Sequence, residues 1–130
     1  MLSLAQCLEK LHTDQLLMAT DCLFCRIVSG EIPATIVAQS DTALAFRDIN
    51  PQAPVHVLVI PKDHVQSLAH AEDAVLLGHL TAFAAEVART EAISEGGYRV
   101  VANIGKNGGQ TVDHLHLHVL GGRQMHWPPG

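Results

Sequence analysis

Hydrophobic residues recur along this chain at two spacings, which predict helices in some segments and strands in others. In segment 72–94 the apolar positions are three or four residues apart, as on one face of an amphipathic helix. The apolar stripe of this long helix is expected to consist of Val75, Leu76, Leu80, Phe83, Val87 and Ala88. Leucines at similar intervals predict a short helix within 2–17. A third helix is expected over 22–29, with Asp21 as its N-cap and Gly30 at its end.

Short runs of β-forming residues predict five strands. They lie at 36–39, 43–47, 55–60, 98–104 and 114–120. Strands, then one long helix, then further strands predict an α+β domain built around an antiparallel sheet. We expect this domain to occupy residues 20–130, after an N-terminal extension over 1–19, and Met18 is an alternative start of the protein.

The composition limits the size and the kind of protein. A chain of 130 residues, 48% of them hydrophobic and 16% charged, fits one domain, and its scarce polar surface favours an oligomer. The net charge of −5 argues against a large nucleic-acid interface, although backbone amides still bind small anions. No apolar run reaches the roughly 18 residues that a membrane span needs, and charges within the first 17 residues argue against a signal peptide.

The three cysteines indicate a reducing, cytoplasmic protein, because an odd number with two in a Cys-x-x-Cys pair is unlike a disulfide framework. That pair is Cys22 and Cys25, and it has three interpretations: half of a tetrahedral zinc site, a redox pair, or two buried thiols. For a zinc site the remaining ligands must be imidazoles, and His64 and His114 are the candidates.

Three histidines alternate with leucines near the end of the chain, at His114, His116 and His118. Alternate residues of a strand share one face, so these imidazoles are expected to project together, about 7 Å apart at successive Cβ atoms. Such a row serves metal binding or acid–base and nucleophilic chemistry. The alternative is a histidine-rich surface strand without a functional role. His56, in an otherwise apolar strand, is either a satisfied core residue or a support for one of these rings.

A glycine-rich segment, Asn107-Gly108-Gly109-Gln110-Thr111, comes just before the histidine row. Glycines allow backbone N–H groups to approach an anion closely, and Thr111 adds a hydroxyl. A pair of glycines alone is most often just a turn. Next to a row of histidines it predicts a phosphate site beside a nucleophile.

Several segments together resemble one known family. They are His114–Leu120, Asp48–Pro54, Val57–Lys62, Gly108–Gln110 and Gly121–Gly130. They are similar to the histidine triad (HIT) superfamily, and in particular to its nucleotide-binding, purine nucleoside phosphoramidase branch, over about residues 20–130. The resemblance implies a homodimeric α+β fold. It also implies hydrolysis of adenosine or guanosine 5′-monophosphoramidates to AMP or GMP through a nucleotidyl-histidine.

The resemblance also implies roles for individual residues. His116 would be the nucleophile, His118 would contact the α-phosphate, and His56 would support the cluster. Asn103, Gly109 and Thr111 would hold phosphate oxygens, with Gln110 beside them in the nucleotide site. The ribose would bind Asp48, and the base pocket would be lined by Phe24, Ile27, Phe46, Ile49 and Leu58. Trp127 would reach the site of the partner subunit.

Relatives that carry Cys-x-x-Cys bind structural zinc, which here implies the ligands Cys22, Cys25, His64 and His114. In that case His114 is structural, and the chemistry itself needs no metal. Two other functions stay open from the sequence: a nucleotide-binding or partner-binding module with little turnover, and a metalloenzyme that uses the three histidines of the row as ligands.

Overall fold

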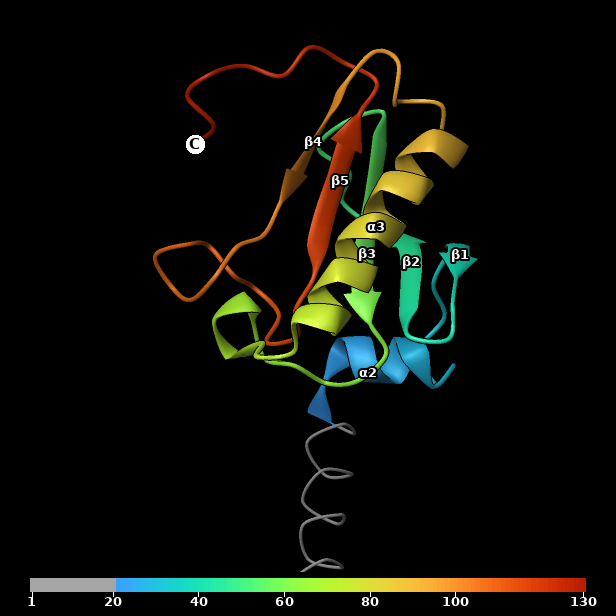
Figure 1. Ribbon diagram of the computed structural model, residues 1–130, viewed down its shortest axis with the longest axis vertical. Helices are drawn as coiled ribbons and strands as arrows, with labels where there is room; N and C mark the ends of the chain where they lie inside the picture. The colour runs from blue at the N-terminus through green and yellow to red at the C-terminus, as the bar shows by residue number, and fades with distance from the viewer. Residues whose placement is uncertain (1–20) are drawn as a thin grey trace, which may run out of the picture.

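The computed structural model describes residues 21–130, in which five antiparallel strands form one sheet in the order β1-β2-β3-β5-β4 (Figure 1). The elements along the chain are α2 (Leu23–Val28), β1 (Ile36–Gln39), β2 (Ala43–Arg47), β3 (Val55–Pro61), the 3-10 turn η1 (Leu68–His70), α3 (Ala74–Thr90), β4 (Tyr98–Val101) and β5 (Leu117–Gly121). The predicted α+β class is therefore confirmed. The helix expected within 2–17 and the alternative start at Met18 lie outside the described residues.

The long helix α3 covers one face of the sheet. Its buried residues, Leu80, Phe83, Ala84, Val87 and Ala88, pack in one cluster with Val57, Val59, Leu117 and Val119 of the central strands. The helix is shorter than the predicted 72–94, because Asp73 accepts hydrogen bonds from the first-turn N–H groups and Ala92 takes a left-handed conformation at φ 60°.

One residue of the predicted stripe is wrong. Val75 is 67% exposed, whereas Leu76 is half-buried and the rest of the stripe is buried. At 100° per residue, Val75 points about 140° away from the centre of the buried face, so helical geometry takes it out of the core.

The short helix α2 packs against the opposite face of the sheet. Phe24 and Ile27 join a second cluster with Leu44, Phe46, Leu58 and Ile60. The predicted N-cap Asp21 is wrong: Cys22 caps the helix, because its sulfur accepts the Cys25 N–H at 3.4 Å. With both faces of the sheet covered, β3 is buried throughout its central residues, which explains its apolar sequence.

Two predicted strands are shorter than expected. The strand predicted over 114–120 begins only at Leu117, opposite Val59 of β3. Continued in this register, Ile60 would pair with His116 and Pro61 with Leu115. Pro61 has no N–H to donate, and its carbonyl instead accepts from the His114 ring. The strand predicted over 98–104 ends at Val101, opposite His118. Among residues 21–130, no helix is long and apolar enough to cross a membrane.

Candidate active site

The three histidines of the row separate into two groups, which corrects the expectation of one shared face. His118 lies in β5, whereas His114 and His116 precede the strand and are not bound by its alternation. His116 and His118 remain neighbours, with ring centroids 5.0 Å apart. The fully buried His114 instead turns toward the two cysteines at the start of α2. The row is therefore a pair of histidines beside a separate cluster.

That cluster consists of Cys22, Cys25, His64 and His114, whose four candidate ligand atoms all lie within 4.8 Å of one another. The Nδ1 atom of His114 lies 3.4 Å from the Cys22 sulfur and 3.5 Å from the Cys25 sulfur, and His64 Nδ1 lies 3.3 Å from the latter. Zinc bonds of about 2.3 Å to sulfur and 2.0 Å to nitrogen place tetrahedral ligands about 3.6 Å apart. The donor set and its spacing therefore fit zinc.

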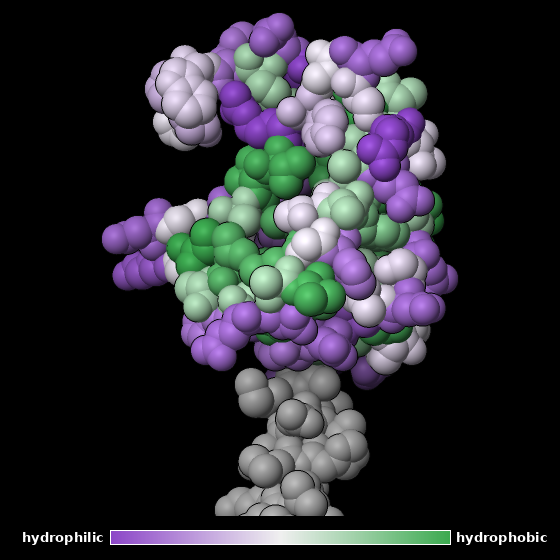
Figure 2. Space-filling view, in the orientation of Figure 1, coloured by the Kyte–Doolittle hydropathy of each residue, from purple (hydrophilic) through white to green (hydrophobic). Residues whose placement is uncertain are grey.

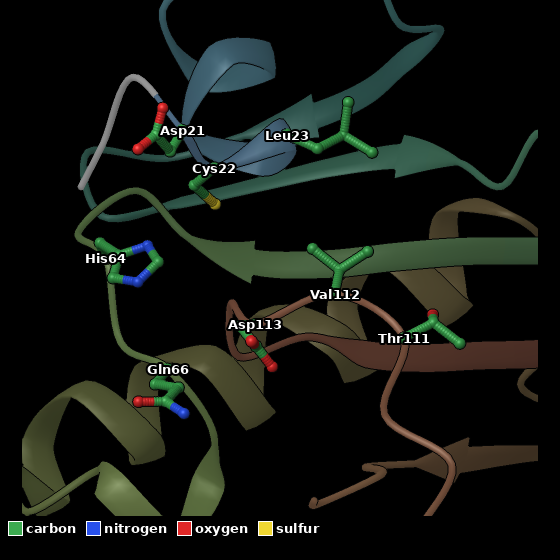
Figure 3. Close-up of a pocket in the computed structure, with 8 residues that line it drawn as sticks. All are labelled: Asp21, Cys22, Leu23, His64, Gln66, Thr111, Val112 and Asp113. Atoms are coloured by element: carbon green, nitrogen blue, oxygen red, sulfur yellow. The ribbon is translucent and has the colours of Figure 1, made fainter. Parts of the chain in front are cut away.

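The surroundings of the cluster also suit a cation. The Nε2–H of His114 donates to the Pro61 carbonyl at 2.9 Å, which leaves Nδ1 unprotonated on the side of the cysteines. Burial lowers the pKa of His114 to about 4, and burial together with the neighbouring Cys22 raises the pKa of Cys25 to about 12. A divalent cation at this place would supply the positive charge that favours the thiolate. Figure 3 shows Cys22 and His64 facing one another beside the cavity described below.

His116 is held in one tautomer by the main chain. Its Nδ1 lies 2.6 Å from the carbonyl oxygen of His114, and because a carbonyl only accepts, Nδ1 carries the proton. The lone pair of the ring is then on Nε2. Phe24 and His118 pack edge-to-face against the ring, with centroids 5.1 and 5.0 Å away, and fix its orientation. This is the arrangement of an imidazole prepared for nucleophilic attack.

His56 and His118 form a hydrogen-bonded pair. The backbone N–H of Gln52 donates to His56 Nδ1 at 3.0 Å, so His56 carries its proton on Nε2. That Nε2–H donates to Nδ1 of His118 at 2.9 Å, which in turn leaves the His118 proton on Nε2, free to donate to a ligand. Burial lowers the pKa of His118 to about 4, with further lowering from His116 and His56 and an opposing effect of Asp48.

The glycine-rich loop is closely built. A Cβ atom on Gly108 would lie 2.2 Å from the backbone oxygen of Ile104, and Gly109 has φ 77°, so glycine is required at both positions. Two of its N–H groups are used within the loop, since Gly109 donates to Lys106 and Gln110 donates to Gly105. The Gln110 side chain binds Gly105 N–H and the carbonyls of Gln66 and Val112. The sequence resemblance implies that Gln110 lies in the nucleotide site. In the structure its side chain forms hydrogen bonds that hold the loop.

A cavity of about 570 Å³ opens between this loop and the cysteine–histidine cluster (Figure 3). Its walls are Asp21, Cys22, Leu23, His64, Gln66, Thr111, Val112 and Asp113. Thr111, expected to hold phosphate, is exposed on this wall. Asn103, also expected there, is half-buried just beyond β4.

The expected base-pocket residues do not all lie together. Phe24, Ile27, Phe46 and Leu58 are buried in one cluster on the histidine face of the sheet. Ile49 is fully exposed, with a relative accessibility of 101%. Trp127 is also exposed, on the C-terminal tail that extends away from the sheet (Figure 1).

Sequence reasoning missed the groups that orient the histidines. They are the His114 and Pro61 carbonyls and the Gln52 N–H, which act through the main chain. Main-chain groups leave no signal in residue type, so only the fold reveals them. The packing of Phe24 on the His116 ring was equally hidden, because both residues lie far apart in sequence.

An antiparallel sheet whose neighbouring strands β3 and β5 carry a hydrogen-bonded histidine pair defines a small α+β protein with a histidine-based site. The chain belongs to the HIT family, whose domain model matches residues 29–125. The resemblance found in the sequence is thereby confirmed at the level of the superfamily.

Several relatives support this membership. An uncharacterized HIT-like protein of Synechococcus elongatus is 54% identical over 115 residues, covering 87% of this chain and all of the relative. A 14 kDa zinc-binding protein of Zea mays is 53% identical over 112 residues, or 83% of this chain and 87% of the relative.

Solved structures agree with the fold. A HIT family hydrolase from Legionella pneumophila superposes with a TM-score of 0.82 at 53% identity, covering 84% of this chain and 99% of that one. A histidine triad nucleotide-binding protein from Candida albicans has a TM-score of 0.73 at 31% identity, with 82% of each chain covered.

Proposed function

We propose that this protein is a nucleoside phosphoramidase of the nucleotide-binding HIT branch, which releases AMP or GMP and an amine. The observation that carries this proposal is the 2.6 Å contact from His116 Nδ1 to the His114 carbonyl, which leaves a nitrogen lone pair on the other side of a fixed ring. His118, whose Nε2 proton is directed away from His56, lies next to it. A fixed nucleophile beside a proton donor suits displacement at phosphorus.

The reaction proceeds in two displacements. His116 Nε2 attacks the α-phosphorus, the P–N bond of the substrate breaks, and the departing nitrogen takes its electron pair and a proton from the His56–His118 pair. Water then attacks the phosphorus of the nucleotidyl-histidine, the bond to His116 breaks, and the water proton returns to the pair. Splitting one difficult hydrolysis into two easier steps is the advantage of the covalent intermediate.

The remaining parts of the ligand fall to the residues around this pair. Asn103, Gly109 and Thr111 are the residues we assign to the phosphate oxygens, and Asp48 beside His56 is the acceptor for ribose hydroxyls. The apolar cluster with Phe24 and Phe46 offers the side of the base pocket. The structural relatives include a HIT family hydrolase and a histidine triad nucleotide-binding protein, which supports this choice of ligand and reaction.

The test is turnover of adenosine 5′-monophosphoramidate by wild-type protein and by His116→Asn. We expect the variant to lose at least about 10³-fold in kcat, because the nucleophile is gone. His79→Asn is the matched control, since His79 is exposed on α3, far along the chain from the site. Wild-type protein that binds AMP but hydrolyses no phosphoramidate would favour a binding module and would defeat the proposal.

We also propose that Cys22, Cys25, His64 and His114 hold a structural zinc ion. The spacing of the donor atoms supports this, and so does the similarity to a zinc-binding protein of Zea mays. When bound, zinc would cross-link the start of α2 to the segments before η1 and β5. No step of the reaction uses it directly.

Loss of zinc is expected to lower the melting temperature and to leave the protein folded enough to bind AMP weakly. Cys25→Ser removes one proposed ligand and should contain less than one tenth of the wild-type zinc by elemental analysis. Ser29→Ala, at the end of the same helix, is the control and should retain the zinc. Equal zinc content in wild type and Cys25→Ser would refute the assigned ligands.

A further inference from the structure

Asp48 is held in a position that its expected contact with ribose does not explain. It follows β2, and its N–H donates to the His56 carbonyl at 3.0 Å, which continues the pairing of β2 with β3 by one residue. One carboxylate oxygen, Oδ1, accepts the Asn50 N–H at 2.8 Å. The other oxygen, Oδ2, therefore faces Nε2 of His56 at 3.4 Å.

The Nε2–H of His56 is thus shared between two acceptors. His118 Nδ1 lies 2.9 Å away and the Asp48 carboxylate 3.4 Å away. The ligand atoms of all three residues lie within 4.8 Å of one another. The side chain of His56 is 3% exposed and that of Asp48 is 18% exposed, so water screens their interaction only weakly.

A positive charge on the two rings needs compensation in such a place. His116, which lies in the segment before β5, and Asp48, which lies at the end of β2, both face the rings. On the neighbouring strands, the residues opposite His118 are the apolar Leu58 and Val101. Among the described residues, Asp48 is the acidic group whose charge favours the protonated form of both rings.

We propose that Asp48 is the counter-charge of the His56–His118 pair and raises the fraction of the pair that carries the proton taken by the departing amine. This inference rests on the proposed function for the identity of the amine. In the reaction, the P–N bond breaks, nitrogen keeps the electron pair, and the proton moves from the pair to that nitrogen. Asp48 does not touch the reacting atoms in this step, so it is a positioning residue for the proton as well as a ligand for ribose.

The first test follows the histidines directly in the ligand-free full chain, by NMR of ¹⁵N-labelled imidazoles over a pH series. Asp48→Asn keeps the shape of the side chain and removes its charge. We expect it to lower the titration midpoint of the His56–His118 pair by about one pH unit. Asp48→Glu, which retains the charge, should titrate near wild type, and so should Asp41→Asn, an equal charge change in the exposed turn between β1 and β2.

This titration does not depend on turnover. Unchanged midpoints in Asp48→Asn would overturn the counter-charge, even if the protein proves to be a phosphoramidase. A lowered midpoint in a protein without phosphoramidase activity would uphold the counter-charge and refute only the assigned reaction. Should Asp48→Asn fail to fold, the comparison of Asp48→Glu with Asp48→Ala gives the same contrast between charge kept and charge lost.

The second test separates the two tasks of Asp48. With a phosphoramidate whose sugar lacks the 2′- and 3′-hydroxyls, the ribose contact is absent in wild type and variant alike. At pH values above the titration midpoint of the His56–His118 pair, Asp48→Asn should still lower kcat about tenfold. The reason is that a shift of about one pH unit in the midpoint changes the protonated fraction about tenfold. It should also move the alkaline limb of the kcat profile to lower pH. An effect seen only with the complete ribose would assign Asp48 to the sugar alone.

Discussion

Main-chain groups decide what each histidine in this site is able to do. The Pro61 carbonyl accepts from His114 Nε2, which leaves the lone pair of Nδ1 toward the cysteines. The His114 carbonyl accepts from His116 Nδ1, which leaves the lone pair of Nε2 for the substrate. The Gln52 N–H does the same for His56, and through it for His118. Three alternate positions of one residue type, His114, His116 and His118, thereby acquire three roles. The sequence motif names the residues, and the backbone around them distributes the roles.

Burial of His118 predicts a loss of stability in mild acid. Its pKa is lowered from 6.5 to about 4 by burial and by the neighbouring histidines. Between these values the unfolded chain takes up a proton that the folded chain refuses, so the free energy of unfolding falls as the pH drops through this window. The contribution of His118 near pH 5 is at most about 2 kcal/mol.

Urea unfolding near pH 7 and near pH 5 measures this effect. Because other groups titrate in the same range, the informative quantity is the difference between wild type and His118→Gln, which lacks the titrating ring. The variant should lose less stability than wild type between the two pH values. An identical loss in both proteins would contradict the lowered pKa.

At the scale of the elements, the periodicity of the sequence predicts most of the fold. The strands expected over 36–39 and 43–47 are confirmed at both ends, and the core of the long helix is confirmed from Leu80 onward. Two boundaries differ from the prediction. The histidine strand starts late because Pro61 of β3 interrupts its ladder, and α2 is capped by Cys22 of the cysteine–histidine cluster.

The glycine-rich loop offers a prediction at this scale. Gly108→Ala would force its Cβ against the backbone of Ile104, so the loop must change shape while the sheet and α3 keep their packing. We expect a roughly tenfold rise in the Kd for AMP, by calorimetry, and little change in melting temperature. Gly96→Ala is the control, because a Cβ there meets nothing within 4 Å. Equal AMP affinity in both variants would show that this loop does not hold the phosphate.

On the scale of the whole molecule, the sheet has an exposed edge at β4. Val100 on this strand and Ile104 just beyond it are 45% and 39% exposed, and Trp127 on the tail is 83% exposed. Figure 2 shows hydrophobic residues gathered below the C-terminal tail, on the side where β4 lies in Figure 1. An apolar strand edge is a surface for pairing with another chain. We therefore propose that two copies associate through β4, which would form the homodimer expected from the family resemblance.

Val100→Glu places a charge in the middle of this edge and is expected to shift the protein from dimer to monomer by light scattering at micromolar concentration. Val75→Glu, an equal change at an exposed position of α3, should leave the mass unchanged. A dimer that persists in Val100→Glu would place the interface elsewhere.

The most direct measurement of the central claim is intact-mass analysis of the enzyme quenched during the first turnovers of adenosine 5′-monophosphoramidate, followed by peptide mapping. A covalent nucleotidyl-His116 predicts a transient mass increase of one adenylyl group, located on the peptide that contains His116 and absent from His116→Asn. An adenylyl group on any other residue, or rapid turnover by His116→Asn, would contradict it.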